Sequence, residues 1–138
     1  MLIISVSDFV GLTLTILLPT MSFTVASISD DTVVVAIGAK LDFRTASDFK
    51  VIYLDQIGTG IRNFILDFTD TGSFDSTGLG SLFTLYRNIS QLGGQVFFAS
   101  LSKTVQYTVH MTHVDKIFRL FPTVDAACEA INKGDTLL

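Results

Sequence analysis

Residues 64–99 read FILDFTDTGSFDSTGLGSLFTLYRNISQLGGQVFFA and contain a strand pattern, a helix pattern and a second strand pattern in succession. The runs Phe64–Phe68 and Gln95–Ala99 are almost continuously apolar, which is typical of strands covered on both faces in a parallel sheet. Between them, residues 78–91 repeat apolar side chains at helical spacing, and Gly93-Gly94 ends the helix. The repeated positions are Leu79, Leu82, Phe83, Tyr86 and Ile89. A strand, a helix and a strand of this length predict a βαβ unit.

Regular patterns continue on both sides of this unit. Further strands are predicted at residues 23–28, 33–37 and 117–118. Further helices are predicted at residues 45–57, 102–111 and 123–132, with Gly134 ending the last one. The link Ser29-Asp30-Asp31 is short and polar, as in a β-hairpin. The sequence therefore predicts a single α/β domain, with a mixed open sheet of about four to five strands and about four helices.

Residues 1–20 do not share the pattern that begins at Phe23. They are rich in apolar residues, but Asp8 and Pro19 interrupt them and they contain no basic residue, so they resemble neither a secretory signal nor a spanning helix. Three interpretations remain: a translation start placed upstream of the true start at Met21, a disordered extension, or a weakly membrane-associating segment. We favour the first, and we place the folded domain at residues 21–138.

Charge and cysteine content restrict the class of partner. The net charge is −4, from 9 basic and 13 acidic residues, and no basic run exists to follow a phosphate backbone. Nucleic acid is therefore excluded as a partner, which leaves a protein or a small ligand. Cys128 has no second cysteine with which to pair, as expected of a protein in the reducing cytoplasm. It is expected to be a small apolar residue and not a nucleophile.

The start of the helix after residue 74 carries two hydroxyl groups, on Ser76 and Thr77. The first N–H groups of a helix lack intrahelical partners and the helix dipole is positive there, so a phosphate on either residue would be stabilised. This pattern predicts a regulatory phosphorylation site. The alternative is that Asp75, Ser76 or Thr77 only caps the helix, because these residue types are preferred as caps for structural reasons.

Two clusters contain residues that can bind metal ions. His110 and His113 are spaced so that both can lie near one face of a helix, but no nearby cysteine or carboxylate pair completes a site. Asp67, Asp70 and Asp75 surround the loop after a predicted strand and could bind a divalent cation, although such acids are also common in turns and caps. We favour the structural interpretation for both clusters and predict no metal site.

Catalytic and cofactor-binding motifs are not found in the sequence. Gly72, Gly78 and Gly80 do not form a phosphate-binding loop, because the Gly-Lys-Ser/Thr ending and the dinucleotide spacing are both missing. We therefore expect neither an enzyme nor a bound cofactor.

From Ser22 to Asn132 the chain resembles STAS domains, and among them the bacterial anti-sigma factor antagonists. The most specific resemblance is the strand Phe64–Phe68, the loop after it, and the block Asp75–Gly80, which is similar to the signature strand, loop and phosphoacceptor helix start of the family. Leu41-Asp42 also resembles the family pattern.

The resemblance implies a partner switch. The unphosphorylated antagonist would bind an anti-sigma factor that is also a serine kinase, and so release a sigma factor. Phosphorylation of Ser76, with Thr77 as the alternative acceptor, would block this binding, and a serine phosphatase would restore it. The implied partner-binding residues are Asp42, Asp75, Ser76, Thr77, Gly78, Leu79 and Gly80. The two glycines would allow close approach of backbone or partner.

One residue departs from the family pattern. His113 stands where the family usually has glycine after its third helix, a position where positive φ is useful.

A competing hypothesis for the function is a STAS subunit that regulates or supports a membrane transport system. A weaker one is a nucleotide- or lipid-binding STAS domain. We do not expect a membrane partner for the leading hypothesis.

Overall fold

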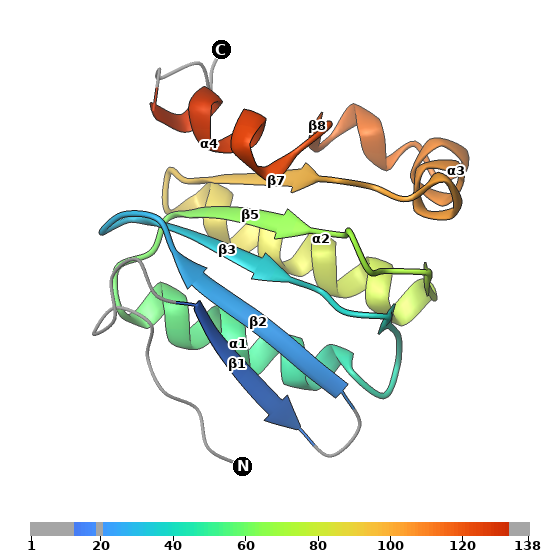
Figure 1. Ribbon diagram of the computed structural model, residues 1–138, viewed down its shortest axis with the longest axis horizontal. Coiled ribbons are helices and arrows are strands. Elements are labelled where there is room, and N and C mark those ends of the chain that lie inside the picture. The colour runs from blue at the N-terminus through green and yellow to red at the C-terminus, as the bar shows by residue number, and fades with distance from the viewer. Residues whose placement is uncertain (1–12, 19–20, 133–138) are drawn as a thin grey trace.

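A mixed sheet of six strands, in the order β1-β2-β3-β5-β7-β8, forms the centre of the computed structural model, which describes residues 13–18 and 21–132 (Figure 1). Its strands are β1 (Thr13–Leu18), β2 (Met21–Ser27), β3 (Thr32–Ala36), β5 (Asn63–Asp67), β7 (Gln95–Ala99) and β8 (Arg119–Phe121). A separate pair consists of β4 (Lys40–Leu41) and β6 (Ser73–Phe74). The helices are α1 (Ala46–Gly58), α2 (Ser76–Gln91), α3 (Lys103–Met111) and α4 (Val124–Asn132).

The strands run antiparallel on one side of the sheet and parallel on the other. β1, β2 and β3 pair antiparallel, whereas β3, β5, β7 and β8 pair parallel. The predicted hairpin between β2 and β3 is closed by the Ile28 N–H, which donates to the Thr32 carbonyl at 3.0 Å. The predicted βαβ unit is β5, α2 and β7, with Phe64 opposite Val96. The prediction of an α/β domain with a mixed sheet is confirmed.

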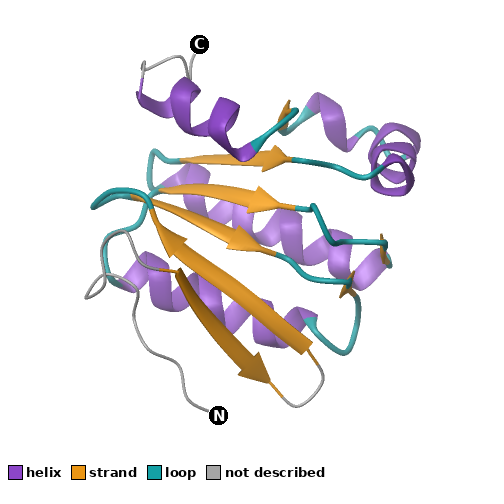
Figure 2. Ribbon diagram, viewed as in Figure 1, coloured by secondary structure: helices purple, strands orange, loops and turns teal. Residues whose placement is uncertain are grey.

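Helices cover both faces of the sheet (Figure 2). α1 and α2 pack on one face, over the larger apolar core, in which Phe98 lies 4.9 Å from Phe68 and 4.3 Å from Phe118 between ring centroids. α4 packs on the other face, where Ala127 and Ala130 contact a smaller core. The phenylalanine-rich strands are therefore buried from both sides, as their near-continuous apolar character indicated.

The short strand predicted around residues 117–118 is present, but it lies slightly later in the chain, as β8. Phe118 itself lies just before this edge strand, in the link that follows the short 3₁₀ helix η2 (Val114–Lys116). Phe118 is buried because it stacks on Phe98 and not because it belongs to a strand. A short apolar run does not distinguish these two causes of burial.

The N-terminal part of the sheet includes a strand that the sequence analysis did not expect. β1 pairs with β2 over its whole length, from Thr13 opposite Ala26 to Leu18 opposite Met21. The boundary predicted at residue 21 therefore lies between two paired strands. The rest of the 1–20 segment and the predicted helix end at Gly134 lie outside the described residues.

Candidate functional site

The start of α2 is capped by one of the three candidate residues. Asp75 has extended backbone angles, and its Oδ1 accepts a hydrogen bond from the Gly78 N–H at 2.8 Å, so Asp75 is the N-cap. Ser76 and Thr77 are the first two residues of the helix, and both are exposed. Since neither hydroxyl is needed as the cap, the two candidate phosphoacceptors lie at the positive end of the helix dipole with their side chains accessible.

The loop between β4 and α1 lies against the start of α2. The strand β4, which leads into this loop, pairs in parallel with β6 and places Leu41 opposite Phe74. The Asp75 N–H donates to the Leu41 carbonyl at 3.3 Å, and Asp75 Oδ2 accepts from the Phe43 N–H at 3.1 Å. These contacts bring the segment that holds Asp42 beside Asp75, although the two residues are far apart in the sequence.

Asp42 is bound within its own loop. Its Oδ1 accepts from the Arg44 N–H at 3.0 Å, and its Oδ2 lies 3.4 Å from Nη2 of Arg44. Desolvation alone would raise the pKa of Asp42, but the hydrogen bonds and the charge of Arg44 outweigh it and hold the pKa below its usual range. Thr45, which is buried, accepts from the Asp42 N–H at 3.0 Å. Asp42 therefore stabilises the loop, and its carboxylate is only partly accessible.

The two glycines of the motif have different surroundings. A Cβ atom on Gly78 would lie 2.0 Å from the Leu41 carbonyl oxygen, so this glycine allows β4 to approach α2 within the chain. A Cβ atom on Gly80 would have no heavy atom within 4 Å. Leu79 is half-buried against the larger core. Of the implied partner-binding residues, Gly78 and Leu79 thus face inward, whereas Asp75, Ser76, Thr77 and Gly80 are exposed.

Hydrogen bonds between loops fix the end of the sheet that carries this site. Thr71, which is buried, donates to the Gly38 carbonyl at 2.6 Å, and Ser102 donates to the Thr71 carbonyl at 3.1 Å. Ser102 also caps α3 by accepting from the Val105 N–H at 3.2 Å. The loops after β3, β5 and β7 are therefore joined at the carboxyl ends of the parallel strands, where α/β proteins usually place their functional residues.

Members of the candidate metal-binding clusters contact other residues of the chain. Asp67 Oδ1 accepts from the N–H and the hydroxyl of Thr69, at 3.0 and 2.6 Å, so it forms a turn. His110 Nδ1 lies 3.7 Å from Asp115 Oδ2 at an exposed position. Within residues 13–18 and 21–132, no group of three or more His, Cys, Asp or Glu residues is arranged to hold a metal ion.

Two further predictions concern single residues. His113 has φ 59° and ψ 23°, in the left-handed region, so the backbone keeps the conformation for which glycine is favoured although the side chain is histidine. Cys128 is half-buried, and burial together with the charge of Asp125 raises the pKa of its thiol. The thiol is therefore a poor nucleophile near neutral pH.

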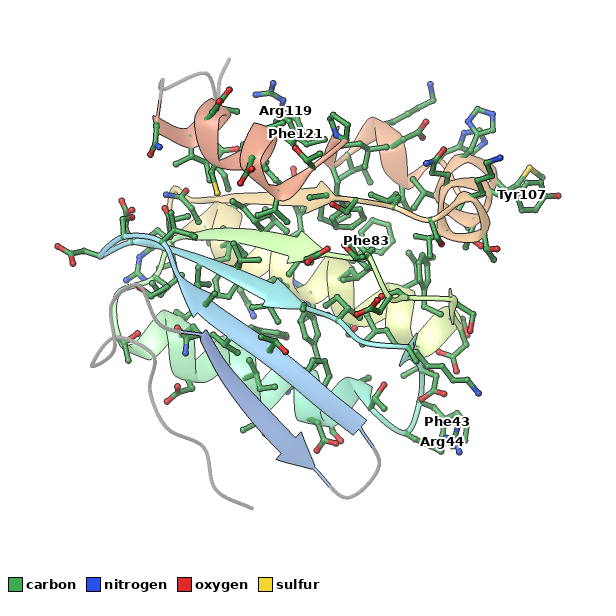
Figure 3. The ribbon with its side chains drawn as sticks, viewed as in Figure 1. Phe43, Arg44, Phe83, Tyr107, Arg119 and Phe121 are labelled. Carbon is green, nitrogen blue, oxygen red and sulfur yellow. The ribbon has the colours of Figure 1, made fainter. Side chains whose placement is uncertain are left out.

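The sequence analysis missed Phe43. This side chain is 70% exposed in the loop beside Asp75 (Figure 3). One sequence signal could have indicated this residue: it is an aromatic residue between two charged residues, in a loop where most side chains are polar.

The family model described as STAS domain matches residues 24–127, which is most of the chain. The chain belongs to the STAS domain family. The resemblance seen in the motif around Ser76 is thereby confirmed at the level of the family. A Thermotoga maritima protein named as an anti-sigma factor antagonist is 27% identical over 107 residues, which cover 77% of this chain and 95% of that protein.

Several solved structures share the fold of this chain. One is the crystal structure of a Thermotoga maritima protein described as an anti-sigma factor antagonist. Its TM-score is 0.72 at 25% identity, and the match covers 83% of this chain and 96% of that one. The anti-sigma factor antagonist SpoIIAA from Bacillus, in its unphosphorylated form, has a TM-score of 0.69 at 19% identity, and it covers 84% of this chain and 98% of that one. The murine anion transporter Slc26a9 contains the same fold, with a TM-score of 0.64 at 19% identity, over 84% of this chain and 21% of that one.

The described part of the chain contains no candidate membrane-spanning helix. None of these helices combines the length and the apolar character that crossing a bilayer requires.

Proposed function

We propose that this STAS domain is an anti-sigma factor antagonist whose binding is switched off by phosphorylation at Ser76. The observation that supports this most strongly is the exposed Ser76 directly after the Asp75 cap, at the first turn of α2. The names of the Thermotoga maritima relative and of SpoIIAA point to the same class of protein. SpoIIAA is also known in a phosphorylated form.

The partner in this proposal is an anti-sigma factor that is also a serine kinase. The unmodified chain binds it and releases a sigma factor, the kinase phosphorylates Ser76, and a serine phosphatase restores the active form. The chain itself is a binding module of the cytoplasm and not an enzyme, it needs no cofactor, and neither nucleic acid nor a membrane is its partner.

A phosphate on Ser76 changes the surface in two ways. It adds about −1.5 to −2 charges beside the Asp75 carboxylate, on a surface that the kinase must cover to reach the hydroxyl. The positive end of the α2 dipole stabilises the phosphate in the free protein by about 0.3–1 kcal/mol. The modified form is thus stable on its own, while its complex must bury or repel the added charge.

The proposal is tested by affinity capture from the native cell extract with wild-type protein and the variants Ser76→Ala, Ser76→Asp and Thr77→Asp. We expect wild type and Ser76→Ala to recover an ATP-binding serine kinase and Ser76→Asp to lose it. Thr77→Asp adds the same charge one residue away and serves as the control for position. Equal recovery by the Ser76 variants, or phosphate found on Thr77 alone, would reject Ser76 as the switch.

The alternative function is a regulatory or structural STAS subunit of a membrane transport system. We keep this alternative because the anion transporter Slc26a9 contains a similar fold, a similarity that concerns the fold only. Recovery of transporter subunits by all variants alike would favour this alternative and leave the Ser76 hydroxyl without a regulatory role.

A further inference from the structure

Among the large apolar side chains of residues 23–132, Phe43 has the largest exposed fraction, at 70%. Figure 3 shows it beside Arg44, projecting outward from the loop that leads into α1. The Arg44 guanidinium carbon lies 5.9 Å from the Phe43 ring centroid and adds only a weak contact at this exposed site. The ring thus gains little from its own chain, and exposed aromatic side chains often serve as contacts for other proteins.

The backbone of Phe43 is fixed by the residue that precedes the proposed phosphoacceptor. One carboxylate oxygen of Asp75 accepts from the Gly78 N–H at 2.8 Å, and the other accepts from the Phe43 N–H at 3.1 Å. Asp75 therefore joins the start of α2 to the loop that carries the exposed ring. Both of its oxygens are engaged within the chain, so its carboxylate is less available for a partner.

We propose that Phe43 is a partner-contact residue and that Asp75 is the positioning residue that holds it in place. This inference rests on the proposed function, because the partner is the same serine kinase. A kinase that reaches the Ser76 hydroxyl must cover the surface next to Asp75, and Phe43 lies on that surface. The ring fits an apolar pocket on the kinase, and since the loop is already ordered, less conformational entropy is lost on binding.

The two roles of Asp75 can be separated with Asp75→Asn. Asparagine caps helices well and keeps one oxygen for the Gly78 N–H, but its amide group cannot accept from the Phe43 N–H. We expect amide hydrogen exchange at Phe43, measured by NMR on the free protein, to be at least about tenfold faster in this variant, while exchange at Gly78 is unchanged. Unchanged exchange at Phe43 would overturn the positioning role.

Binding to the recovered kinase is then measured for Phe43→Ala, Asp75→Asn and the double variant. We expect Phe43→Ala to weaken binding at least about tenfold and Asp75→Asn about fivefold. The double variant should bind as Phe43→Ala does, because Asp75 acts through Phe43. Additive losses would mean that Asp75 contacts the kinase directly, which would overturn the inference.

Leu92→Ala is the matched control. Leu92 is also an exposed apolar residue, at 46%, and follows the other end of α2, about 24 Å from Ser76 along the helix axis. Its substitution should leave binding unchanged, and an equal loss there would show that Phe43 has no special role.

The outcomes distinguish the inference from the proposed function. If wild type binds the kinase, Ser76→Asp does not, and Phe43→Ala binds as wild type does, the function stands and the inference fails. If wild type recovers no kinase, the proposed function fails and the partner-contact role of Phe43 fails with it.

Discussion

Replacing Gly78 with alanine should destabilise the fold, although alanine is the better helix former. The added Cβ atom would lie 2.0 Å from the Leu41 oxygen and 2.7 Å from the Leu41 carbonyl carbon, both of which belong to the backbone. Real Cβ atoms essentially never approach within 3.0 Å, so β4 and α2 must separate by about 1 Å. That movement strains the hydrogen bond from the Asp75 N–H to the Leu41 carbonyl.

The expected magnitude combines three terms. Overpacking a well-filled contact costs about 1–3 kcal/mol, a weakened hydrogen bond costs about 1 kcal/mol, and the better helix propensity of alanine returns about 1 kcal/mol. The net loss in the free energy of unfolding is about 2 kcal/mol. Gly80→Ala is the matched control, because nothing lies within 4 Å of the added Cβ atom and only the propensity term applies. That control should be more stable than wild type by about 0.5–1 kcal/mol.

Urea unfolding followed by circular dichroism measures both changes. The midpoint should fall by about 1 M for Gly78→Ala and rise by a smaller amount for Gly80→Ala, with similar slopes. A Gly78→Ala protein as stable as Gly80→Ala would refute the packing argument. The same pair tests the role that the family resemblance gave to these glycines: if the kinase approaches Gly80 closely, Gly80→Ala binds it more weakly despite its higher stability.

Three further predictions concern other residues. His113→Gly should raise the free energy of unfolding by about 0.5–1 kcal/mol, because φ 59° is strained for a side chain, and a lower melting temperature would contradict this. The lowered pKa of Asp42 means that its carboxylate stabilises the fold above the pKa of the unfolded chain and loses this effect as pH falls through the folded pKa. Asp42→Asn should therefore be less stable than wild type at pH 7, and a series of urea midpoints should show this difference shrinking as pH falls through the lowered folded pKa; a constant difference would count against it. Cys128 should react with iodoacetamide more slowly than free cysteine at pH 7, since its pKa is raised, and an equal rate would show an accessible thiolate.

The sequence predicted the parallel part of the fold because its signals are local and strong. The apolar runs of β5 and β7 and the stripe of α2 each fit a single secondary structure. β1 was missed although residues 13–16 alternate Thr with Leu or Ile. Pro19 and the many apolar residues of the 1–20 segment led us to interpret the whole segment as lying outside the folded domain. The pair β4 and β6 has only two residues in each strand, too few to give a period.

The candidate site was predicted only in part, because its geometry depends on contacts between distant segments. The sequence located Asp75, Ser76 and Thr77 at a helix start, but all three are of types that cap helices, and only the hydrogen bond to Gly78 shows which one does so. The contact between Asp75 and Phe43 joins residues 32 positions apart, and no local pattern encodes it. The resemblance left open whether backbone or a partner approaches Gly78, and the structure places the backbone of Leu41 there.

The short edge strand β8 affects how copies of this protein meet. A sheet edge presents unpaired N–H and C=O groups that another chain can join, and long flat edges promote aggregation. β8 offers three residues, and the Arg119 guanidinium lies over the rings of Phe97 and Phe121, at 5.5 and 5.0 Å. A short strand with a cation beside it is a poor template for strand addition. On this side of the sheet, the edge therefore disfavours backbone pairing between copies of the protein.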